Sequence, residues 1–490
     1  MKFQVPASRR VALQRAVATA RVSRTRLQAV YADTPDHRLA AAGLALRLRK
    51  EGRVWVQTLK GRGDGLMQRL EHEVALPAQT GVPALDPGRH AGTPAGALLA
   101  AALGTQGRLA PLYRTDIQRL HRRVRHAGAV IEIAYDVGRI LAGAKSLAVN
   151  EIEFELISGP PAALPELAQR WAQRHGLWWD VRTKSERGFR LALGLQQVPA
   201  VRARAVVLRD GSDLHSAWQA MLQSALGHAL PNAAELAAGT GDAPHLHQLR
   251  VALRRLRTAL SLFAPWSAQD EAVLALEARW REAFARLGAA RDADVLADTL
   301  WPELLAAGAP ALRRTAPPPA VDIGDFLRDS AFSVLLLQTL AFATTEVATR
   351  IAAVPESTGP ALAEEARRVL KAAWRRAHAD ARQFEHAPDE LRHRARKRLK
   401  RFRYALEFVA SALPRKPIRA LQRALAKTLE ALGQFNDLQV ADTHFRAQPE
   451  PEPGDWFALG WLSAQRGPAL HQALHSLRRL DKAPKIPRPA

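Results

Sequence analysis

His247-Gln-Leu-Arg250-Val-Ala-Leu-Arg254-Arg255-Leu-Arg257 has a counterpart later in this chain, His393-Arg-Ala-Arg396-Lys-Arg-Leu-Lys400-Arg401-Phe-Arg403. Basic residues follow the histidine at +3, +7, +8 and +10 in both copies. Steps of three and four residues place the histidine and the residues at +3, +7 and +10 on one stripe of an α-helix. The repeat therefore predicts two equivalent helices, each with a histidine and cations along one side.

The similarity between the two copies continues beyond these helices. Leu287-Gly-Ala-Ala-Arg291-Asp292 begins 40 residues after the first histidine, and Leu432-Gly-Gln-Phe-Asn436-Asp437 begins 39 residues after the second. A glycine shortly before Arg-Asp or Asn-Asp is typical of a helix end that is followed by the cap of a new helix. The second half of the chain is therefore predicted to be a several-helix bundle that occurs twice.

Cations at this spacing destabilise a helix unless something compensates their charge. Like charges at i,i+3 or i,i+4 cost about 0.2–0.5 kcal/mol per pair. The stretch Arg367–Arg403 alone carries 14 Lys and Arg against 4 Asp and Glu. Runs of charge are usually solvated faces, but a ligand that supplies the opposite charge also resolves such a conflict. The repetition at identical spacing favours a surface that binds a polyanion.

The composition of the whole chain points the same way. Its 490 residues include 71 Lys and Arg against 47 Asp and Glu, which gives a net charge of +24. A field of that sign attracts nucleic acid, condensed phosphate or an anionic membrane surface. A compositional preference for Arg and Ala is the alternative explanation. Specific nucleic-acid binding is disfavoured, because only 6% of the residues are aromatic and the sequence has no recognisable stacking or recognition-helix motif.

The sequence also bears on compartment and membranes. It contains no cysteine, which excludes disulfides and thiolate metal sites. The first residues lack the basic and then apolar pattern of a signal peptide. The sequence has no run of about 18 apolar residues, the length that a membrane-spanning helix requires. We therefore expect a cytoplasmic protein with no membrane partner.

Short runs of alternating apolar and polar residues characterise the first half of the chain. The clearest are Leu44–Arg49, Arg69–Val74, Ile131–Val137 and Glu151–Leu156. Successive side chains of a strand point to opposite faces, so each of these strands has one apolar and one charged face. A solvated charged face is the ordinary interpretation. Acids on some strands and arginines on others, with enough strands to close a barrel, favour a barrel that encloses the charges.

These patterns divide the chain into two predicted domains. Residues 1–199 are predicted to form a β barrel, and residues 212–480 an all-α domain of duplicated helical bundles. The fold class is therefore α+β with two domains. Gly194–Asp210 is interpreted as the connection between them. Gly81–Gly107, rich in Gly, Ala and Pro, is expected to be a loop between strands.

Enclosed charges of both signs suit the chemistry of condensed phosphates. Arginines and lysines bind phosphate oxygens. Clustered carboxylates hold a hard divalent cation such as Mg²⁺ or Mn²⁺. Charge neutralisation and a positioned water are what the hydrolysis of a phosphoanhydride requires.

Several motifs of the first half occur in an order that is informative as a set. They are Tyr31-Ala-Asp-Thr-Pro35, Gly43-Leu-Ala-Leu-Arg-Leu-Arg49, Trp55-Val-Gln-Thr-Leu-Lys-Gly61, Arg69-Leu-Glu-His-Glu73, Ile131-Glu-Ile-Ala-Tyr-Asp-Val-Gly138, Glu151-Ile-Glu-Phe-Glu-Leu156 and Thr183-Lys-Ser-Glu-Arg-Gly188. Over about residues 2–195 they resemble the CYTH, or triphosphate tunnel, family. The resemblance implies an antiparallel β tunnel that hydrolyses inorganic triphosphate with a divalent metal ion, Mg²⁺ or Mn²⁺.

The resemblance also implies roles for individual residues. Phosphate contacts fall to Lys2, Arg47, Arg49 and Arg119, and catalytic roles to Lys60, Lys184, Glu71 and Glu73. The implied metal ligands are Glu132, Asp136, Glu153 and Glu155. Internal ion pairs across the tunnel are the alternative for any one of these residues.

One departure from the family concerns the first strand. Family members open with Glu-x-Glu-x-Lys, whereas this sequence opens with Met1-Lys-Phe-Gln-Val-Pro6. Lys2 matches the lysine of the motif, so both glutamates would lie upstream of Met1. The loss of two carboxylate ligands would weaken metal binding. The alternative function is therefore that of a non-catalytic polyphosphate-binding protein.

The duplicated helices resemble the CHAD, or conserved-histidine α-helical, domain over about residues 212–480. The resemblance implies a basic pore or cleft between two similar halves that binds polyphosphate, and with it an association with polyphosphate granules. It maps phosphate binding onto His247, Arg250, Arg254, Arg255, Arg257, His393, Arg396, Lys400, Arg401 and Arg403. The histidines either hydrogen-bond phosphate or are buried structural residues.

Overall fold

The structure is a computed structural model that describes residues 1–19, 21–63, 69–77, 79, 81–104, 107–208, 213–263, 271–288, 300–310, 322–346 and 359–487. The chain divides into two compact units, each made of several segments. The N-terminal unit comprises Met1–Val201, Leu230–His245 and Gly324–Thr345. The C-terminal unit comprises Arg202–Ala229, Leu246–Ile323 and Glu346–Ala490. Parts of the helical half of the sequence therefore belong to the N-terminal unit.

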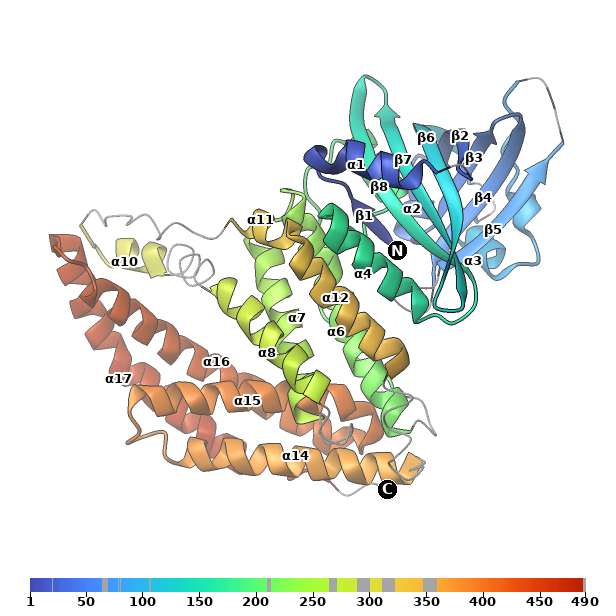
Figure 1. The fold of residues 1–490 in the computed structure, drawn as a ribbon. Coiled ribbons are helices and arrows are strands. Elements are labelled where there is room, and N and C mark those ends of the chain that lie inside the picture. Colours follow the sequence, from blue (N-terminus) through green and yellow to red (C-terminus); the bar gives the residue numbers. More distant parts are fainter. Residues whose placement is uncertain are drawn as a thin grey trace. The chain divides into compact units, whose positions relative to one another are not determined.

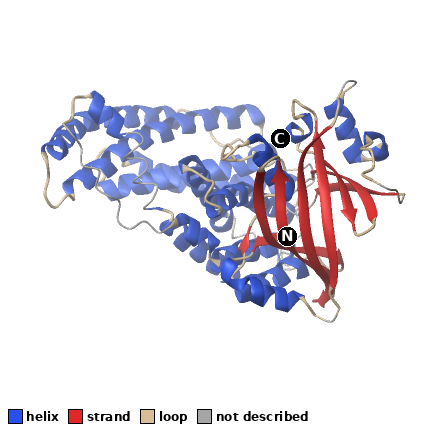
Figure 2. Ribbon diagram, turned by 90° about the horizontal axis from the view of Figure 1, so that it is seen from above, coloured by secondary structure: helices blue, strands red, loops and turns tan. Residues whose placement is uncertain are grey.

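The N-terminal unit is built on a nine-stranded sheet in which neighbouring strands pair antiparallel (Figure 2). The order of the strands is β5-β4-β3-β2-β6-β7-β8-β1-β9. Their bounds are β1 (Lys2–Gln4), β2 (Ser23–Asp33), β3 (Ala45–Glu51), β4 (Val54–Arg62), β5 (Arg69–Leu76), β6 (Ala110–His126), β7 (Ala129–Ala142), β8 (Lys145–Ser158) and β9 (Trp178–Trp179). The predicted antiparallel β architecture of the first half is confirmed.

Helices cover the apolar, outer face of this sheet. Leu46 of β3 and Leu59 of β4 lie in one core cluster with Leu99 of α3 (Pro94–Leu103). Farther along the sheet, Phe154 of β8 packs edge-on against Trp171 of α4, with 5.9 Å between the ring centroids. The residues that alternate with these side chains lie on the opposite, inner face of the sheet.

The prediction of a loop over Gly81–Gly107 was wrong for much of that segment. It contains the 3-10 helix η2 (Pro87–His90) and helix α3. Thr93 caps α3 by accepting a hydrogen bond from the Gly96 amide at 2.9 Å, and a proline occupies the first turn of the helix. Leu99 and Leu103 of this helix are buried against the leucines of β3 and β4, whereas Leu98 is exposed.

Helix α5 (Lys184–Leu193) packs against β6, β7 and β8. Its Phe189 packs against the core cluster that contains Tyr113 of the inner face. Gly188 makes the closest approach, because a Cβ added there would lie 2.2 Å from the Tyr113 ring. The first residue of α5, Lys184, lies among the charged side chains of the inner face.

The remaining helices are α1 (Arg10–Val17), α2 (Arg38–Ala41), α4 (Ala163–His175), α6 (Leu214–Ala237), α7 (Ala243–Leu262), α8 (Glu271–Arg286), α10 (Trp301–Ala306), α11 (Ile323–Arg328), α12 (Ser330–Ala341), α14 (Gly359–Arg382), α15 (Asp389–Val409), α16 (Arg415–Arg446) and α17 (Pro453–Asp481), with short turns η1 (Ala7–Arg9), η5 (Phe342–Glu346) and η6 (Ala410–Ala412). In the C-terminal unit α14 packs along α15, and α16 packs along both α15 and α17 (Figure 1). The predicted all-α architecture of the second half is confirmed.

The predicted helix break in the second copy of the repeat was wrong. Helix α16 runs without interruption through Gly433, Asn436 and Asp437. A glycine inside a helix costs about 1 kcal/mol relative to alanine, and burial of Leu432 and Phe435 on either side offsets that cost. In the first copy, Arg291 and Asp292 lie outside the described residues.

None of the described helices combines the length of a membrane-spanning segment with a sufficiently apolar run.

Candidate functional site

The register of the strands brings charged residues from distant parts of the sequence to one face. Asp136 of β7 lies opposite Arg119 of β6 and opposite Glu151 of β8. Glu153 lies opposite Lys2 of β1. Residues directly opposite one another in an antiparallel pair point to the same face. The inner face therefore carries both acids and bases, as the alternation in the sequence predicts.

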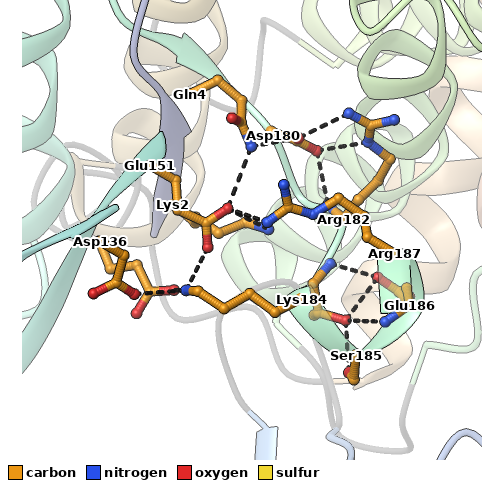
Figure 3. Close-up of polar contacts among 12 residues, drawn as sticks. Lys2, Gln4, Asp136, Glu151, Asp180, Arg182, Lys184, Ser185, Glu186 and Arg187 are labelled. Atoms are coloured by element: carbon orange, nitrogen blue, oxygen red, sulfur yellow. Dashed lines mark hydrogen bonds and ion pairs between the residues drawn. The ribbon is translucent and has the colours of Figure 1, made fainter. Parts of the chain in front are cut away.

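Three carboxylates converge on this face, and we call Asp136, Glu151 and Glu153 the acidic centre. One oxygen of each lies within 4.8 Å of the others. The ammonium of Lys184 lies among them, 2.7 Å from Asp136 and 2.8 Å from Glu153, and it also contacts Glu151 (Figure 3). Arg119 donates to Asp136 at 2.7 Å and to Glu153 at 2.8 Å.

Glu151 is the member of the acidic centre that the family resemblance did not assign. Its side chain is fully buried, contacts Arg187 of α5, and accepts a hydrogen bond from Gln4 at 3.3 Å. Lys2 lies 3.8 Å from the same carboxylate. The signal was present in the sequence, because Glu151 and Glu153 are two residues apart on one strand and so share a face.

Asp136 and Glu153 of the acidic centre are ionised and charge-paired. Burial alone would raise the pKa of Asp136, but Lys184 and Arg119 overcome it and hold that pKa below its ordinary value. The pKa of Glu153 lies well below its ordinary value, because Lys184 and Arg119 again outweigh burial. Burial opposes the charge of Lys184, yet Glu151 and Glu153 raise its pKa.

A second set of charges occupies β3, β4 and β5, and we call Arg47, Arg49 and Lys60 the basic wall. Lys60 lies 2.7 Å from Glu71, and Arg49 donates to Glu73 at 3.2 Å. Arg47 donates to the Tyr31 hydroxyl at 3.0 Å and lies 3.9 Å from Glu73. Burial and the neighbouring Arg47 lower the pKa of Lys60. The structure thus brings together five residues that the resemblance assigned to the site: Arg47, Arg49, Lys60, Glu71 and Glu73.

Two of the predicted metal ligands lie apart from the acidic centre. Glu132 and Glu155 face each other across β7 and β8. Glu132 lies 3.6 Å from His121 and 3.8 Å from Arg123, and Glu155 is exposed. Of the four predicted ligands, the structure therefore groups only Asp136 and Glu153.

The acidic centre suits a hard divalent cation in the kind of atoms it offers. Mg²⁺ and Mn²⁺ prefer carboxylate oxygens, and three are close together here. The ammonium of Lys184 contacts the same three carboxylates. A divalent ion at this position would therefore compete with Lys184 for its ligands.

In the C-terminal unit the two histidine-containing stripes lie on α7 and α15. We call them together the paired stripe: His247, Arg250, Arg254, Arg257, His393, Arg396, Lys400 and Arg403. All eight side chains are partly buried. Burial, then Arg396 and Arg254, lower the pKa of Lys400 to about 6. An effect of Arg254 on Lys400 requires the two helices to be close there, so the structure brings the stripes together.

The two halves of the paired stripe have matching surroundings. A Cβ added at Gly288 would lie 3.6 Å from Arg250, and one added at Gly433 would lie 3.8 Å from Arg396. Both glycines follow the leucine of the extended repeat. The duplication in the sequence is thus a duplication in space.

Some members of the paired stripe are held by protein groups. Arg257 donates to Glu277 at 2.9 Å, and Arg403 lies 3.2 Å from Glu407. His393 hydrogen-bonds Asn436 at 2.9 Å, and burial lowers its pKa. This arrangement favours the structural interpretation of His393.

The residues at +8 are not equivalent in the two copies. Arg255 is 2% exposed, with its guanidinium 5.0 Å from the centre of the Phe408 ring. Arg401 is exposed. The side chain at +8 points about 100° around the helix from the side chain at +7. On α7 this side of the helix is buried against α15, whereas on α15 the corresponding side is exposed. Arg255 therefore lies away from the paired stripe.

Comparisons with known proteins also divide the chain into an N-terminal and a C-terminal part. A family model for the CYTH domain matches residues 1–189, and one for the CHAD domain matches residues 220–446. An inorganic triphosphatase from Haemophilus influenzae is 30% identical over 168 residues, which cover 33% of this chain. The match spans 44% of that relative's length.

Two solved structures are also similar. The CHAD domain from the plant Ricinus communis is 28% identical and covers 59% of this chain and 99% of its own, with a TM-score of 0.42. A putative adenylyl cyclase from Hippeastrum, described as having a dominant triphosphatase activity, is 17% identical and covers 39% of this chain and 93% of its own, with a TM-score of 0.30. By the two family models, the chain consists of a CYTH domain over residues 1–189 followed by a CHAD domain over residues 220–446.

Proposed function

We propose that the N-terminal unit hydrolyses inorganic triphosphate with Mg²⁺ or Mn²⁺ and that the paired stripe binds polyphosphate. The observation that carries the first part is the inner face itself. It places the acidic centre and the basic wall on one surface of a single sheet. The relative from Haemophilus influenzae that bears the name of this activity supports the assignment.

In this proposal the residues of the inner face have different roles. Arg47, Arg49 and Lys60 neutralise phosphate oxygens, and the forked guanidinium groups fix their orientation. Glu73 accepts hydrogen bonds from Arg49 and Thr58, so it holds that arginine and is placed to orient a water. A bound divalent cation would supply further charge neutralisation, with Asp136, Glu151 and Glu153 as ligands.

The hydrolysis proposal is tested by phosphate release from triphosphate in Mg²⁺ or Mn²⁺. Glu73→Ala should abolish metal-dependent release, because it removes the carboxylate that positions Arg49. Exposed Glu303, on α10, provides a matched control, since Glu303→Ala should leave the rate unchanged. Undiminished release by Glu73→Ala would remove this residue from the site.

A non-catalytic, phosphate-binding function is the second candidate. It is favoured by the ion pairs of the acidic centre, because Lys184 and Arg119 already satisfy Asp136 and Glu153. Binding of triphosphate without release of phosphate in either metal would identify this function.

Polyphosphate binding rests on the paired stripe. A linear chain with about one charge per phosphate suits two facing rows of cations and needs no base-specific contacts. We place this function in the cytoplasm, with polyphosphate granules as the associated structure and without specific nucleic acid. In this proposal residues 1–199 carry the hydrolytic activity, and residues 212–480 bind polyphosphate.

A fourfold substitution tests the stripe. Replacing four of its residues together by Ala should abolish polyphosphate binding; they are Arg250, Arg254, Arg396 and Lys400. The matched control replaces four exposed arginines of the same unit by Ala, Arg368, Arg376, Arg446 and Arg478, and so removes the same number of basic side chains. Equal loss of affinity in both variants would show that total charge, and not the stripe, determines binding.

A further inference from the structure

A buried carboxylate of α6 connects to the acidic centre. Glu235 is 3% exposed and belongs to the N-terminal unit, although it lies within the stretch that matches the CHAD family model. It accepts two hydrogen bonds from Arg190, at 2.7 and 2.9 Å, and one from Thr240 at 2.7 Å. Arg182 lies 3.7 Å away. Glu235 therefore holds two arginines, of which Arg182 lies inside the CYTH match and Arg190 lies one residue beyond its end.

The first arm of this network runs along α5. Arg190 is six residues after Lys184 on the same helix, and Arg187 lies between them. Arg187 and Lys184 both contact Glu151. Helix α5 is thus held by Glu235 at one end and by the acidic centre at the other, so its position along the inner face depends on both contacts.

The second arm runs through the loop before α5 (Figure 3). Arg182 donates to both oxygens of Asp180 at 2.9 Å. Asp180 is fully buried and accepts a hydrogen bond from Gln4 at 2.9 Å. Gln4 in turn donates to Glu151 at 3.3 Å. Arg182 precedes Lys184 in the sequence and Arg190 follows it. Both arginines contact Glu235.

Charge supports this arrangement. Burial would raise the pKa of Glu235, but the hydrogen bond from Arg190 and the other contacts hold it below its ordinary value. Burial also opposes the charge of Asp180, yet Lys2 and Arg182 lower its pKa to about 2. Both carboxylates are ionised at neutral pH, so both arms are charge-assisted hydrogen bonds, which are the strongest and the most directional kind.

We propose that Glu235 is a positioning residue for Lys184: through Arg190 and Arg182 it sets where the ammonium of Lys184 lies in the acidic centre. The proposal rests on the proposed function only in taking triphosphate as the ligand of the inner face. It means that the site of the CYTH domain is completed by a residue of the CHAD stretch, which never touches the ligand.

The test compares full-length variants. Glu235→Gln keeps the size of the side chain and removes its charge, and Arg182→Lys keeps the charge and removes the fork. Misplacement of a ligand-binding group by about 1 Å costs up to a hundredfold, so we expect KM for triphosphate to rise about tenfold or more. A variant that is only destabilised would lose active fraction and show a lower apparent kcat with KM unchanged.

Asp380→Asn is the matched control. Asp380 of α14 is 8% exposed and is also held by two arginines, Arg394 at 3.1 Å and Arg398 at 2.9 Å. It should lose comparable thermal stability and keep the KM of the unmodified protein. Arg182→Lys decides the question if Glu235→Gln does not fold.

Calorimetric binding of triphosphate separates this proposal from the proposed hydrolysis. If the unmodified protein binds triphosphate but releases no phosphate, the hydrolysis proposal fails, and weaker binding by Glu235→Gln still supports the positioning role. Unchanged KM and unchanged affinity in both variants would overturn it. Absence of triphosphate binding by the unmodified protein would overturn both proposals.

Discussion

Replacing Lys400 by Arg should change how polyphosphate binding depends on pH. Lys400 of α15 lies close enough to Arg254 of α7 for the charge of that arginine to act on it. The charged groups that act on it are Arg254 of α7, Arg396 and Arg403 of α15, and Asp437 of α16. Burial and the arginines together lower its pKa to about 6, and Asp437 opposes them. A bound polyanion would reverse the sign of this environment and favour the charged ammonium.

The size of the effect follows from that pKa. At pH 7.5 a lysine with a pKa of about 6 is charged in about one molecule in thirty, so binding must take up a proton. Below pH 6 the ammonium is already present and affinity is highest. Above pH 6 affinity should fall by up to about tenfold, or 1.4 kcal/mol, for each pH unit until the pKa of the bound state is reached.

Calorimetry in two buffers of different ionisation enthalpy measures the proton uptake directly. The unmodified protein should take up about one proton for each bound chain at pH 8. Lys400→Arg should take up none, and its affinity at pH 8 should equal its own affinity at pH 6, because arginine stays charged at both pH values. Lys371→Arg, at an exposed position of α14, is the matched control and should behave as the unmodified protein does. The low pKa of His393 keeps it neutral at pH 8. Equal proton uptake by the unmodified protein and Lys400→Arg would refute the reasoning.

Two further predictions concern the N-terminal unit. Gly188→Ala should destabilise the protein by about 1–3 kcal/mol, because the new Cβ meets the Tyr113 ring; denaturant unfolding measures this, and exposed Gly467→Ala, with no atom within 4 Å of its added Cβ, is the control. Lys184→Met should lower the melting temperature by leaving the acidic centre without its ammonium. Added Mn²⁺ should then restore part of that loss, and identical melting curves with and without Mn²⁺ would contradict a cation site there.

The alternation of residues predicted the faces of the sheet correctly. Leu46 lies on the covered outer face, and Arg47 lies on the inner one. This works because side chains of a strand alternate with a period of two whatever the strand pairs with. The stripe on α7 and α15 was predictable for the same kind of reason, since the period of a helix is a local property.

The predictions that failed concern positions where tertiary packing, and not the period of the strand or helix, determines the structure. Glu151, Glu153 and Glu155 alternate identically, yet only the first two converge, because the neighbours on β1, β6 and α5 come from distant parts of the chain. Gly433 was interpreted as a helix end, but the helix continues through it and both Leu432 and Phe435 beside it are buried. Glu235 carries no local sign of a connection to the acidic centre.

The sequence by itself therefore determined which side chains share a face, that the helical module occurs twice, and which families the chain resembles, because each depends on spacing along the backbone. Only the tertiary structure decided which carboxylates meet at Lys184, that Arg255 is buried while Arg401 is exposed, and that Glu235 is held by Arg182 and Arg190. Those outcomes depend on contacts between residues far apart in sequence, whose distances are set when strands and helices pack.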